Sequence, residues 1–573
     1  MVLIKLLFLI FALTGRVNED LPADKQQFIS PVKIPLLLSA NFGEIRSDHF
    51  HSGIDIRTQG VIGHEIVAAA SGYVYRIGVA PGGFGKALYL RHPSGHSTVY
   101  AHLDRFTPEI EEFVINQQYT LRNFTVSLFP PKDKFVFKQG ELIGFSGNTG
   151  SSQGPHLHYE IRRASDEFPI DPLQFEFGVR DNIKPIIERL VLYPGSGYTS
   201  INGKNQELLL QAQGSHGNYY VSSERTPTVS GRVGFGISTY DLLNDSWNKC
   251  GVRSISLVVG IDTIYNFVID GFAFDETRYI NSHIDYRRKV RDNITVQRLF
   301  VAPNDKLSVY KGVVNRGFYD FVSDSTYTVR VIVTDVHENS SVLTFRVKAA
   351  AGRELPVEAG GSNGRLLRWD KPYRMTDGDI TVAIPSLALY DSVRFTYSRQ
   401  EMPESLYADV FTILDRFVPL HRPYKLSIKP LRVPEGLKSK MAMVTIDEKG
   451  KVSYAGGEWS GEFLTGDFRS FGRYSVGIDT VAPVINSNGF RSGSDLTGRR
   501  ELRFLISDDF SGIKSYEAYI DDKWVLFEYD PKNKLIVHRF DAKRITKGIN
   551  HTFRLRVVDN RDNATELKAE FRW

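Results

Sequence analysis

Hydrophobic and polar residues alternate in short runs along most of the chain. Residues 87–92 and 96–102 each show this alternation, and Pro93-Ser94-Gly95 separates them. Successive side chains of a strand point to opposite faces, so the two runs and the turn residues between them predict a β-hairpin. Residues 67–77 and 141–145 are further strand candidates, and residues 30–178 contain no convincing amphipathic helix. The pattern predicts an all-β fold.

Strand patterns continue at regular spacing after residue 181, and part of this region is repeated. Residues 181–187 (DNIKPII) resemble residues 479–485 (DTVAPVI), and residues 328–335 (TVRVIVTD) resemble residues 552–559 (TFRLRVVD). Short alternating strands of this kind are typical of immunoglobulin-like β-sandwiches. A Gly/Ala-rich stretch at 349–364 reads as a linker. We therefore expect five segments: a leader (1–19), a compact β-domain (30–178), a sandwich with insertions (181–349), a β-rich sandwich (365–478) and a C-terminal sandwich (479–573).

The first residues have the character of an export signal. Residues 1–13 are apolar except for Lys5. This run is shorter than the ~20 apolar residues that span a bilayer, but it suits the core of a signal peptide. No later stretch is long and apolar enough for a membrane span. We expect an exported protein of the periplasm or extracellular space, with no transmembrane anchor in the mature chain.

Composition excludes several classes of function. The net charge of +5 on 573 residues is weak and dispersed, which argues against nucleic acid as a partner and is compatible with an anionic cell wall. The only cysteine is Cys250, so an intrachain disulfide and a four-cysteine zinc site are excluded. Eight of the 14 histidines lie between His49 and His158, which marks residues 30–178 as the chemical domain.

Two pairs of residues in that domain are typical metal ligands. His156 and His158 are two residues apart on a predicted strand, so both imidazoles face the same side. His51 and Asp55 are four residues apart near the beginning of the domain. A catalytic zinc ion needs three protein ligands and one open position. The two pairs together with His102, at the end of a third strand, predict such a site.

The motifs around these residues resemble one known family. They comprise FHSGIDI (50–56), VYAHL (99–103), QGELIG (139–144), SGNTG (146–150) and GPHLHYE (154–160). In order and character they are similar to the lysostaphin/LytM-type zinc endopeptidases of bacterial cell walls. The resemblance covers about a quarter of the chain.

The resemblance implies specific roles for the residues that match it. One Zn²⁺ per chain would be bound by His51, Asp55 and His158. His156 would be the general base on the water that the metal activates. His102 would be the second catalytic histidine, which stabilises the developing oxyanion or orients the water.

The implied reaction is hydrolysis of peptide bonds in peptidoglycan. Bonds between D-Ala and a diamino acid are the first expectation for the bond cut, and glycyl bonds are the second. Arg46 and Tyr100 are candidate substrate contacts. Glu160 shares the face of the two histidines, where a solvated strand end is favoured over a role behind the metal ligands. Residues 104–138 are longer than the corresponding family connection, which predicts an extra hairpin or lid beside the groove.

A second reading of the chain belongs to a different class of protein. The domain at 30–178 could retain the peptidase fold without activity, as an activator module or wall-binding scaffold in which the sandwiches are the working part. The sandwiches would then bind a wall or envelope partner. Metal content discriminates the two readings, because a scaffold does not require one zinc ion per chain.

Overall fold

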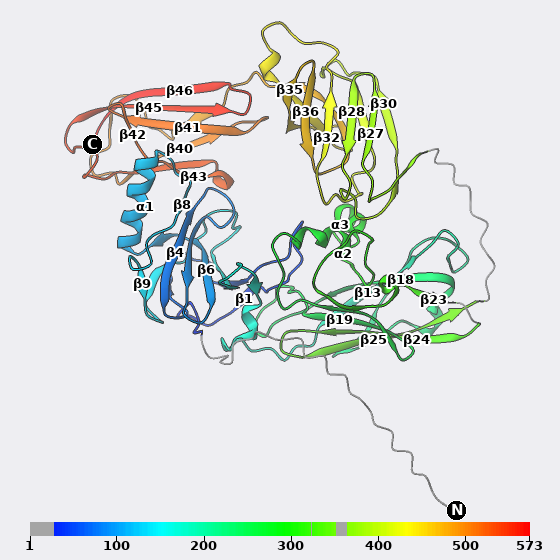
Figure 1. The fold of residues 1–573 in the computed structure, drawn as a ribbon. Coiled ribbons are helices and arrows are strands. Elements are labelled where there is room, and N and C mark those ends of the chain that lie inside the picture. Colours follow the sequence, from blue (N-terminus) through cyan, green and yellow to red (C-terminus); the bar gives the residue numbers. More distant parts are fainter. Residues whose placement is uncertain (1–27, 322–323, 351–363) are drawn as a thin grey trace, which may run out of the picture.

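The computed structural model describes residues 28–573 except 322–323 and 351–363. Strands in separate sheets make up most of it, and helices are few and short (Figure 1). The all-β fold class is therefore confirmed. The expected leader at 1–19 lies outside the described residues. Within the described part of the chain, no helix is long and apolar enough to cross a membrane.

The first domain is built on one large antiparallel sheet. Its central strands are adjacent in the order β1-β2-β11-β6-β5-β4-β8. The expected hairpin is present as β5 and β6. The strand bounds are β1 (Leu38–Ala40), β2 (Ile54–Arg57), β11 (His156–Arg163), β6 (His96–Leu103), β5 (Lys86–Arg91), β4 (Gly72–Val79) and β8 (Val126–Leu128).

Strand β11 lies between β2 and β6, and its register places His158 beside Asp55. His158 is opposite Asp55 on β2 and opposite Ala101 on β6. Leu157 and Tyr159 alternate with the histidines and are fully buried in the core of the domain. Burial of this apolar face fixes the register, because a slip by one residue would move every side chain of the strand to the other face.

Residues 104–138 contain a helix where the sequence suggested a hairpin or lid. Helix α1 spans Pro108–Leu121, with proline in its first turn and a buried stripe formed by Ile110, Val114 and Gln118. The expectation that residues 30–178 lack an amphipathic helix is therefore wrong. Only two of these three buried residues, Ile110 and Val114, are apolar, which makes the helical period hard to see among so many strand patterns.

The first sandwich shares its hydrophobic core with the first domain. Its longest strands are β18 (Thr228–Tyr240) and β25 (Ser340–Ala349). Phe42 and Phe50 of the first domain are 3% and 1% exposed and belong to the sandwich core. Both rings pack on Phe272, with centroids at 5.3 and 5.6 Å. The Asn41 side chain also exchanges two hydrogen bonds with the backbone of Gly251, at 2.8 and 2.7 Å.

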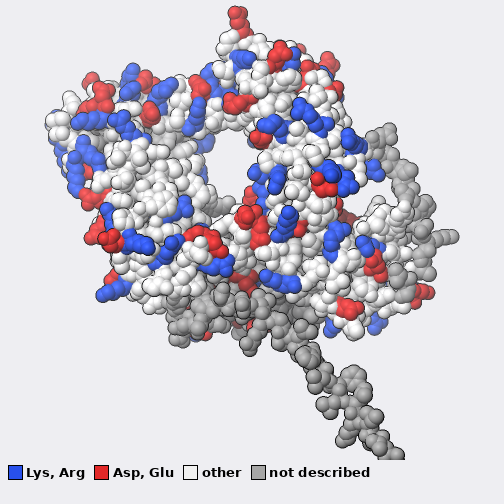
Figure 2. Space-filling view, viewed as in Figure 1, with Lys and Arg blue, Asp and Glu red and all other residues white. Residues whose placement is uncertain are grey.

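The remaining two units each consist of two sheets around their own core. Residues 373–478 form two five-stranded sheets, and residues 484–572 form a four-stranded and a five-stranded sheet. In the space-filling view, the lobes surround a central opening (Figure 2). The C-terminal sandwich lies beside α1 (Figure 1), so the end of the chain returns to its first domain.

Specific contacts join the C-terminal sandwich to α1. The ring of Tyr119 meets Trp524 edge-on at 5.4 Å, and the Arg544 guanidinium lies 3.8 Å from the centre of the Tyr119 ring. Arg544 also donates to the Asn116 side chain at 2.6 Å. Helix α1 is therefore the part of the 104–138 segment on which the C-terminal sandwich docks, and the lid stays a prediction.

The shared core predicts a large effect of one phenylalanine. We expect Phe50→Ala to lower the free energy of unfolding by about 3–5 kcal/mol, because it leaves a cavity between two packed domains. Urea unfolding followed by tryptophan fluorescence measures the change. Phe129→Ala is the matched control, because Phe129 is 70% exposed. Equal effects of the two substitutions would show that Phe50 is not part of a shared core.

Candidate metal centre

Three side chains meet at the junction of β2 and β11. The atoms His51 Nε2, Asp55 Oδ1 and His158 Nδ1 lie 2.9–3.1 Å from one another. These side chains are 8%, 12% and 5% exposed. Zinc binds imidazole nitrogen and carboxylate oxygen at about 2.0–2.2 Å, so atoms this close together suit ligands of a single ion. The sequence-predicted ligand set is thus brought together by the fold.

Hydrogen bonds behind the two histidines orient their rings. His51 Nδ1 donates to the carbonyl oxygen of Asn41 at 2.7 Å. His158 Nε2 donates to Glu160 Oε1 at 2.8 Å. In both rings the other nitrogen then points at the cluster, as is usual for metal-binding histidines. The donor set and its supports fit a zinc ion.

Glu160 is buried, so the expectation of a solvated strand end is wrong. The residue is 0% exposed, and it also accepts a hydrogen bond from Ser52 Oγ at 2.5 Å. Burial raises its pKa, but Arg162 and His158 outweigh this effect and lower the pKa to about 2. Glu160 is therefore a charged support for His158. Its position two residues after His158 on one strand face was the available signal for this role.

The electrostatics of the metal-free cluster favour a proton on His158. Burial lowers the pKa of His158, but hydrogen bonds to Asp55 and Glu160 outweigh it and raise the pKa to about 9. Burial also opposes the charge of Asp55, yet the neighbouring His51 and His158 hold its pKa well below the usual range. A metal ion must therefore displace a proton from His158 when it binds.

His156 adjoins the ligands without being one of the three. Its Nδ1 lies 2.8 Å from the carbonyl oxygen of Gly154 and donates to it, and Ser152 Oγ is 3.1 Å away. Its Nε2 is 3.6 Å from Asp55 Oδ1. Burial lowers the pKa of His156, so the ring is neutral at pH 7. A neutral imidazole with Nδ1 protonated presents a proton-accepting Nε2.

His102 reaches the site through an unusual backbone conformation. Alternation along β6 would place His102 and Tyr100 on the same face. The His102 backbone has φ +62°, and its ring lies 4.7 Å from that of His156. Tyr100 points into the core instead, where it is 0% exposed and packs edge-on against Tyr159. Tyr100 is therefore a core residue rather than a substrate contact.

A neighbouring loop orients the His102 ring. His102 Nδ1 donates to the carbonyl oxygen of Thr149 at 2.8 Å. Burial, together with the nearby His158 and His156, lowers the pKa of His102 to about 3. His102 is thus a second neutral imidazole whose Nε2 can accept a hydrogen bond.

The same loop is bound from outside by the C-terminal sandwich. Lys532 Nζ donates to the carbonyl oxygens of Ser152 at 3.1 Å and Gly150 at 3.4 Å, and to that of Asn148. Both candidate catalytic histidines bond this loop, one through Thr149 and the other through Ser152. A side chain from the far end of the sequence therefore braces the loop that orients them.

Two further side chains border the cluster. Arg46 Nη2 lies 3.2 Å from Asp55 Oδ2, the carboxylate oxygen that is not shared with the histidines. Its side chain is 35% exposed, so it remains a candidate substrate contact. The Phe84 ring stacks on His158 at 5.0 Å. Phe84 was not found from the sequence, because its loop carries no motif beyond the glycines of a turn.

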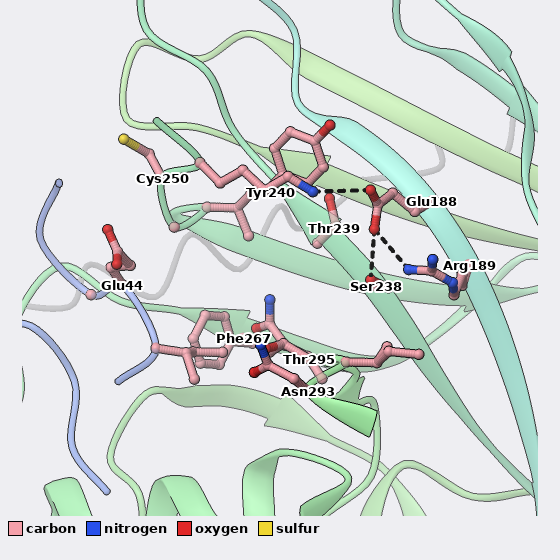
Figure 3. Close-up of a pocket in the computed structure, with 17 residues that line it drawn as sticks. Glu44, Glu188, Arg189, Ser238, Thr239, Tyr240, Cys250, Phe267, Asn293 and Thr295 are labelled. Atoms are coloured by element: carbon pink, nitrogen blue, oxygen red, sulfur yellow. Dashed lines mark hydrogen bonds and ion pairs between the residues drawn. The ribbon is translucent and has the colours of Figure 1, made fainter. Parts of the chain in front are cut away.

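A cavity of 390 Å³ lies beside the segment that precedes His51. Figure 3 shows Glu44 on one side of it and Glu188 on the other. Glu188 is bonded within the protein, since it accepts hydrogen bonds from Arg189, Ser238 and Lys249. None of the five histidine and aspartate residues of the candidate centre lines this cavity. We therefore place the chemistry at the cluster on β2 and β11.

Comparisons with known families match two parts of the chain. Residues 49–119 match the model described as peptidase family M23, and residues 364–479 match a Zu5-like domain. The first region includes His51, Asp55 and His102, whereas His156 and His158 lie beyond the matched residues. The first domain is an M23 peptidase domain.

Individual relatives are similar to this chain over the same domain. The protein named DD-carboxypeptidase/endopeptidase Mpg from Neisseria meningitidis serogroup B is 35% identical over 123 residues, which are 22% of each chain. Lysostaphin from Staphylococcus staphylolyticus is 27% identical over 128 residues, again 22% of each chain. The chain thus spans about a fifth of the length of these relatives. A solved catalytic domain of lysostaphin from Staphylococcus simulans is 24% identical over 24% of this chain and 90% of that one, with a TM-score of 0.18.

The buried support of His158 predicts how the centre binds zinc. We expect Glu160→Gln to weaken zinc affinity about 10–100-fold, because the neutral amide no longer strengthens the ligand behind it. Isothermal titration of the metal-free full chain measures the affinity. Repeating the titration in buffers of different ionisation enthalpy should show a proton released at pH 7. Glu109→Gln, on an exposed position of α1, is the matched control. Equal affinities of the two variants would refute the support role.

Proposed function

We propose that the M23 domain is a zinc-dependent endopeptidase that hydrolyses peptide bonds of bacterial peptidoglycan. One observation carries this proposal: two neutral histidines, each held through Nδ1 by a backbone carbonyl oxygen, lie beside a set of three candidate metal ligands. The similarity to proteins named DD-carboxypeptidase/endopeptidase and lysostaphin supports the substrate class. The full ligand set favours this function over a non-catalytic scaffold.

Each residue of the site has a role in the proposed reaction. Bound by His51, Asp55 and His158, a zinc ion would supply Lewis acidity to the scissile carbonyl and to the attacking water. His156 accepts the proton of that water at Nε2 and later transfers it to the leaving amine. The first step requires a neutral His156 ring, which its lowered pKa favours. The second step uses the proton that the ring gained in the first.

His102, whose ring lies next to that of His156, assists in the proposed reaction. Its Nδ1 is engaged by Thr149, so its free Nε2 can accept a hydrogen bond from the water and orient it. To donate to a developing oxyanion, His102 must first take up a proton, and its pKa of about 3 opposes this. The low pKa of His102 therefore favours orientation of the water over stabilisation of the oxyanion.

The proposed endopeptidase function includes a cellular location and a class of bond. We propose export to the periplasm or cell surface, where peptidoglycan is found, and cleavage of D-Ala–diamino-acid or glycyl bonds. Arg46 is exposed beside Asp55 and offers a guanidinium to a substrate carboxylate. The sandwiches would contact the wall or an envelope partner.

Digestion of purified cross-linked peptidoglycan tests the activity. We expect the full chain to release new amino termini, a chelator to stop this release, and His156→Ala to lower the rate by about 10²–10⁴-fold. Mass spectrometry of the products identifies the bond. His49→Ala is the control, because the His49 side chain is 53% exposed and lies outside the cluster. No release from protein with one bound zinc ion would indicate a latent or partner-activated site, whereas no release and no bound zinc would favour the scaffold reading.

The bracing of the 148–152 loop predicts a role for Lys532. We expect Lys532→Ala to lower kcat about 10-fold with little change in KM, because the loop then orients His102 and His156 less well. Lys532→Arg should restore part of the rate. Lys568→Ala is the control, since Lys568 lies on the same sandwich and is 71% exposed. An unchanged kcat in Lys532→Ala would show that the loop does not need this contact.

A further inference from the structure

A second cluster of ligand-type side chains lies in the first sandwich, where the chain leaves the peptidase domain. One ligand atom from each of Asp181, Asp335 and His337 lies within 4.8 Å of the others. Asp181 precedes the first strand of the sandwich, β13 (Ile186–Pro194). Asp335 and His337 follow the end of β24 (Thr326–Thr334). The cluster therefore joins two segments that are about 150 residues apart in the sequence.

Two polar atoms of this cluster are buried without a hydrogen bond and have only each other as a distant ion-pair partner. The Asp181 side chain is 0% exposed, and its Oδ2 has no hydrogen bond. His337 Nδ1, 3.6 Å from that oxygen, also has none. A buried polar atom that lacks a hydrogen bond is costly, so native structures rarely contain them in groups. Their grouping indicates that a bound ligand, rather than another protein atom, is the partner of these atoms.

Asp241 adds an independent observation. It follows the end of β18, is 1% exposed, and its Oδ1 has no hydrogen bond. Burial, together with the charges of Asp181 and Asp335, raises the pKa of Asp241 to about 9. Asp335 accepts hydrogen bonds from the backbone and the side chain of Asn339, both at 2.9 Å, which orient its carboxylate. Among the described residues, no lysine or arginine forms an ion pair with these three carboxylates.

The second copy of the repeat provides an internal comparison. Asp479, Asp508 and Asp559 occupy the corresponding positions, and their oxygens also lie close together. There, each carboxylate accepts hydrogen bonds from backbone N–H groups. The position of His337 is taken by Arg561, which donates to the carbonyl oxygen of Met441 and to Tyr454. Only the first copy combines the acidic cluster with an imidazole and unpaired oxygens.

We propose that Asp181, Asp241, Asp335 and His337 form a second divalent metal site, distinct from the catalytic centre. Three carboxylates and one imidazole suit a transition-metal ion such as Zn²⁺ or Mn²⁺ better than Ca²⁺ or Mg²⁺, which prefer oxygen ligands alone. A divalent ion would neutralise most of the buried negative charge. It would link the ends of β18 and β24 to the segment that leaves the peptidase domain.

The surroundings of His337 support this assignment. His337 also contacts the backbone of Val179, so one ring nitrogen can bond to the chain while Nδ1 remains available to the ion. A cavity of 500 Å³ is lined by His337, Arg253 and Glu338. Of the proposed ligands, only His337 borders this cavity.

Metal counting on the full chain tests the proposal. The protein is stripped with EDTA, reloaded in parallel with Zn²⁺ or Mn²⁺, desalted and analysed by mass spectrometry of the metal. His337→Arg reproduces the residue of the second copy and should lower the count of at least one ion by one per chain. Asp241→Asn, which keeps the side-chain shape, should do the same. His216→Ala, an exposed histidine of the same sandwich, should leave the count unchanged.

A second measurement separates this site from the catalytic centre. In a His158→Ala background, the added ion should still raise the melting temperature, and His337→Arg in that background should abolish the increase. Counts for both ions that are equal in wild type, His337→Arg and Asp241→Asn would overturn the proposal. An ion-dependent increase that persists in the double variant would also overturn it. Circular dichroism establishes that each variant is folded.

Discussion

The antiparallel register of β11 against β2 is the constraint on which the candidate metal centre depends. It sets His158 directly opposite Asp55, and the loop before β2 then brings His51 to the same point. The register is fixed by the opposite face of β11, where Leu157, Tyr159 and Ile161 are fully buried. The same hydrophobic burial that stabilises the domain therefore also aligns its metal ligands, because the two faces of a strand cannot move independently.

The hydrogen-bond partners of the histidines divide them into two chemical classes. His158 faces two carboxylates, so a cation at its position is stabilised, whether a proton or a metal ion. Burial lowers the pKa of His102 and of His156, and neither ring is bonded to two carboxylates as His158 is, so both remain neutral. The candidate metal ligands and the neutral histidines are close neighbours. The burial of each ring and the group that its second nitrogen bonds decide whether it carries a charge.

The first and the C-terminal sandwich each stabilise part of the M23 domain. Phe42 and Phe50, on either side of the turn that leads to His51, are packed in the core of the first sandwich. At the other end of the chain, Lys532 bonds the loop that orients His102 and His156. The segment that leads to His51 and the 148–152 loop are thus each stabilised by a different sandwich. The proposed second metal site would strengthen the first of these connections at its base.

The sequence by itself determined the strand content and the hairpin, because alternation of apolar and polar residues is a local property. The candidate ligand set of His51, Asp55 and His158 was implied by the resemblance of the short motifs to a known family. The sequence could not place His102 and Tyr100 on opposite faces, since this depends on the left-handed backbone at His102. Nor could it show that Glu160 is buried, that residues 108–121 form a helix, or that Lys532 lies near the centre. Those features result from packing between segments up to several hundred residues apart, and only the tertiary structure decides which of them meet.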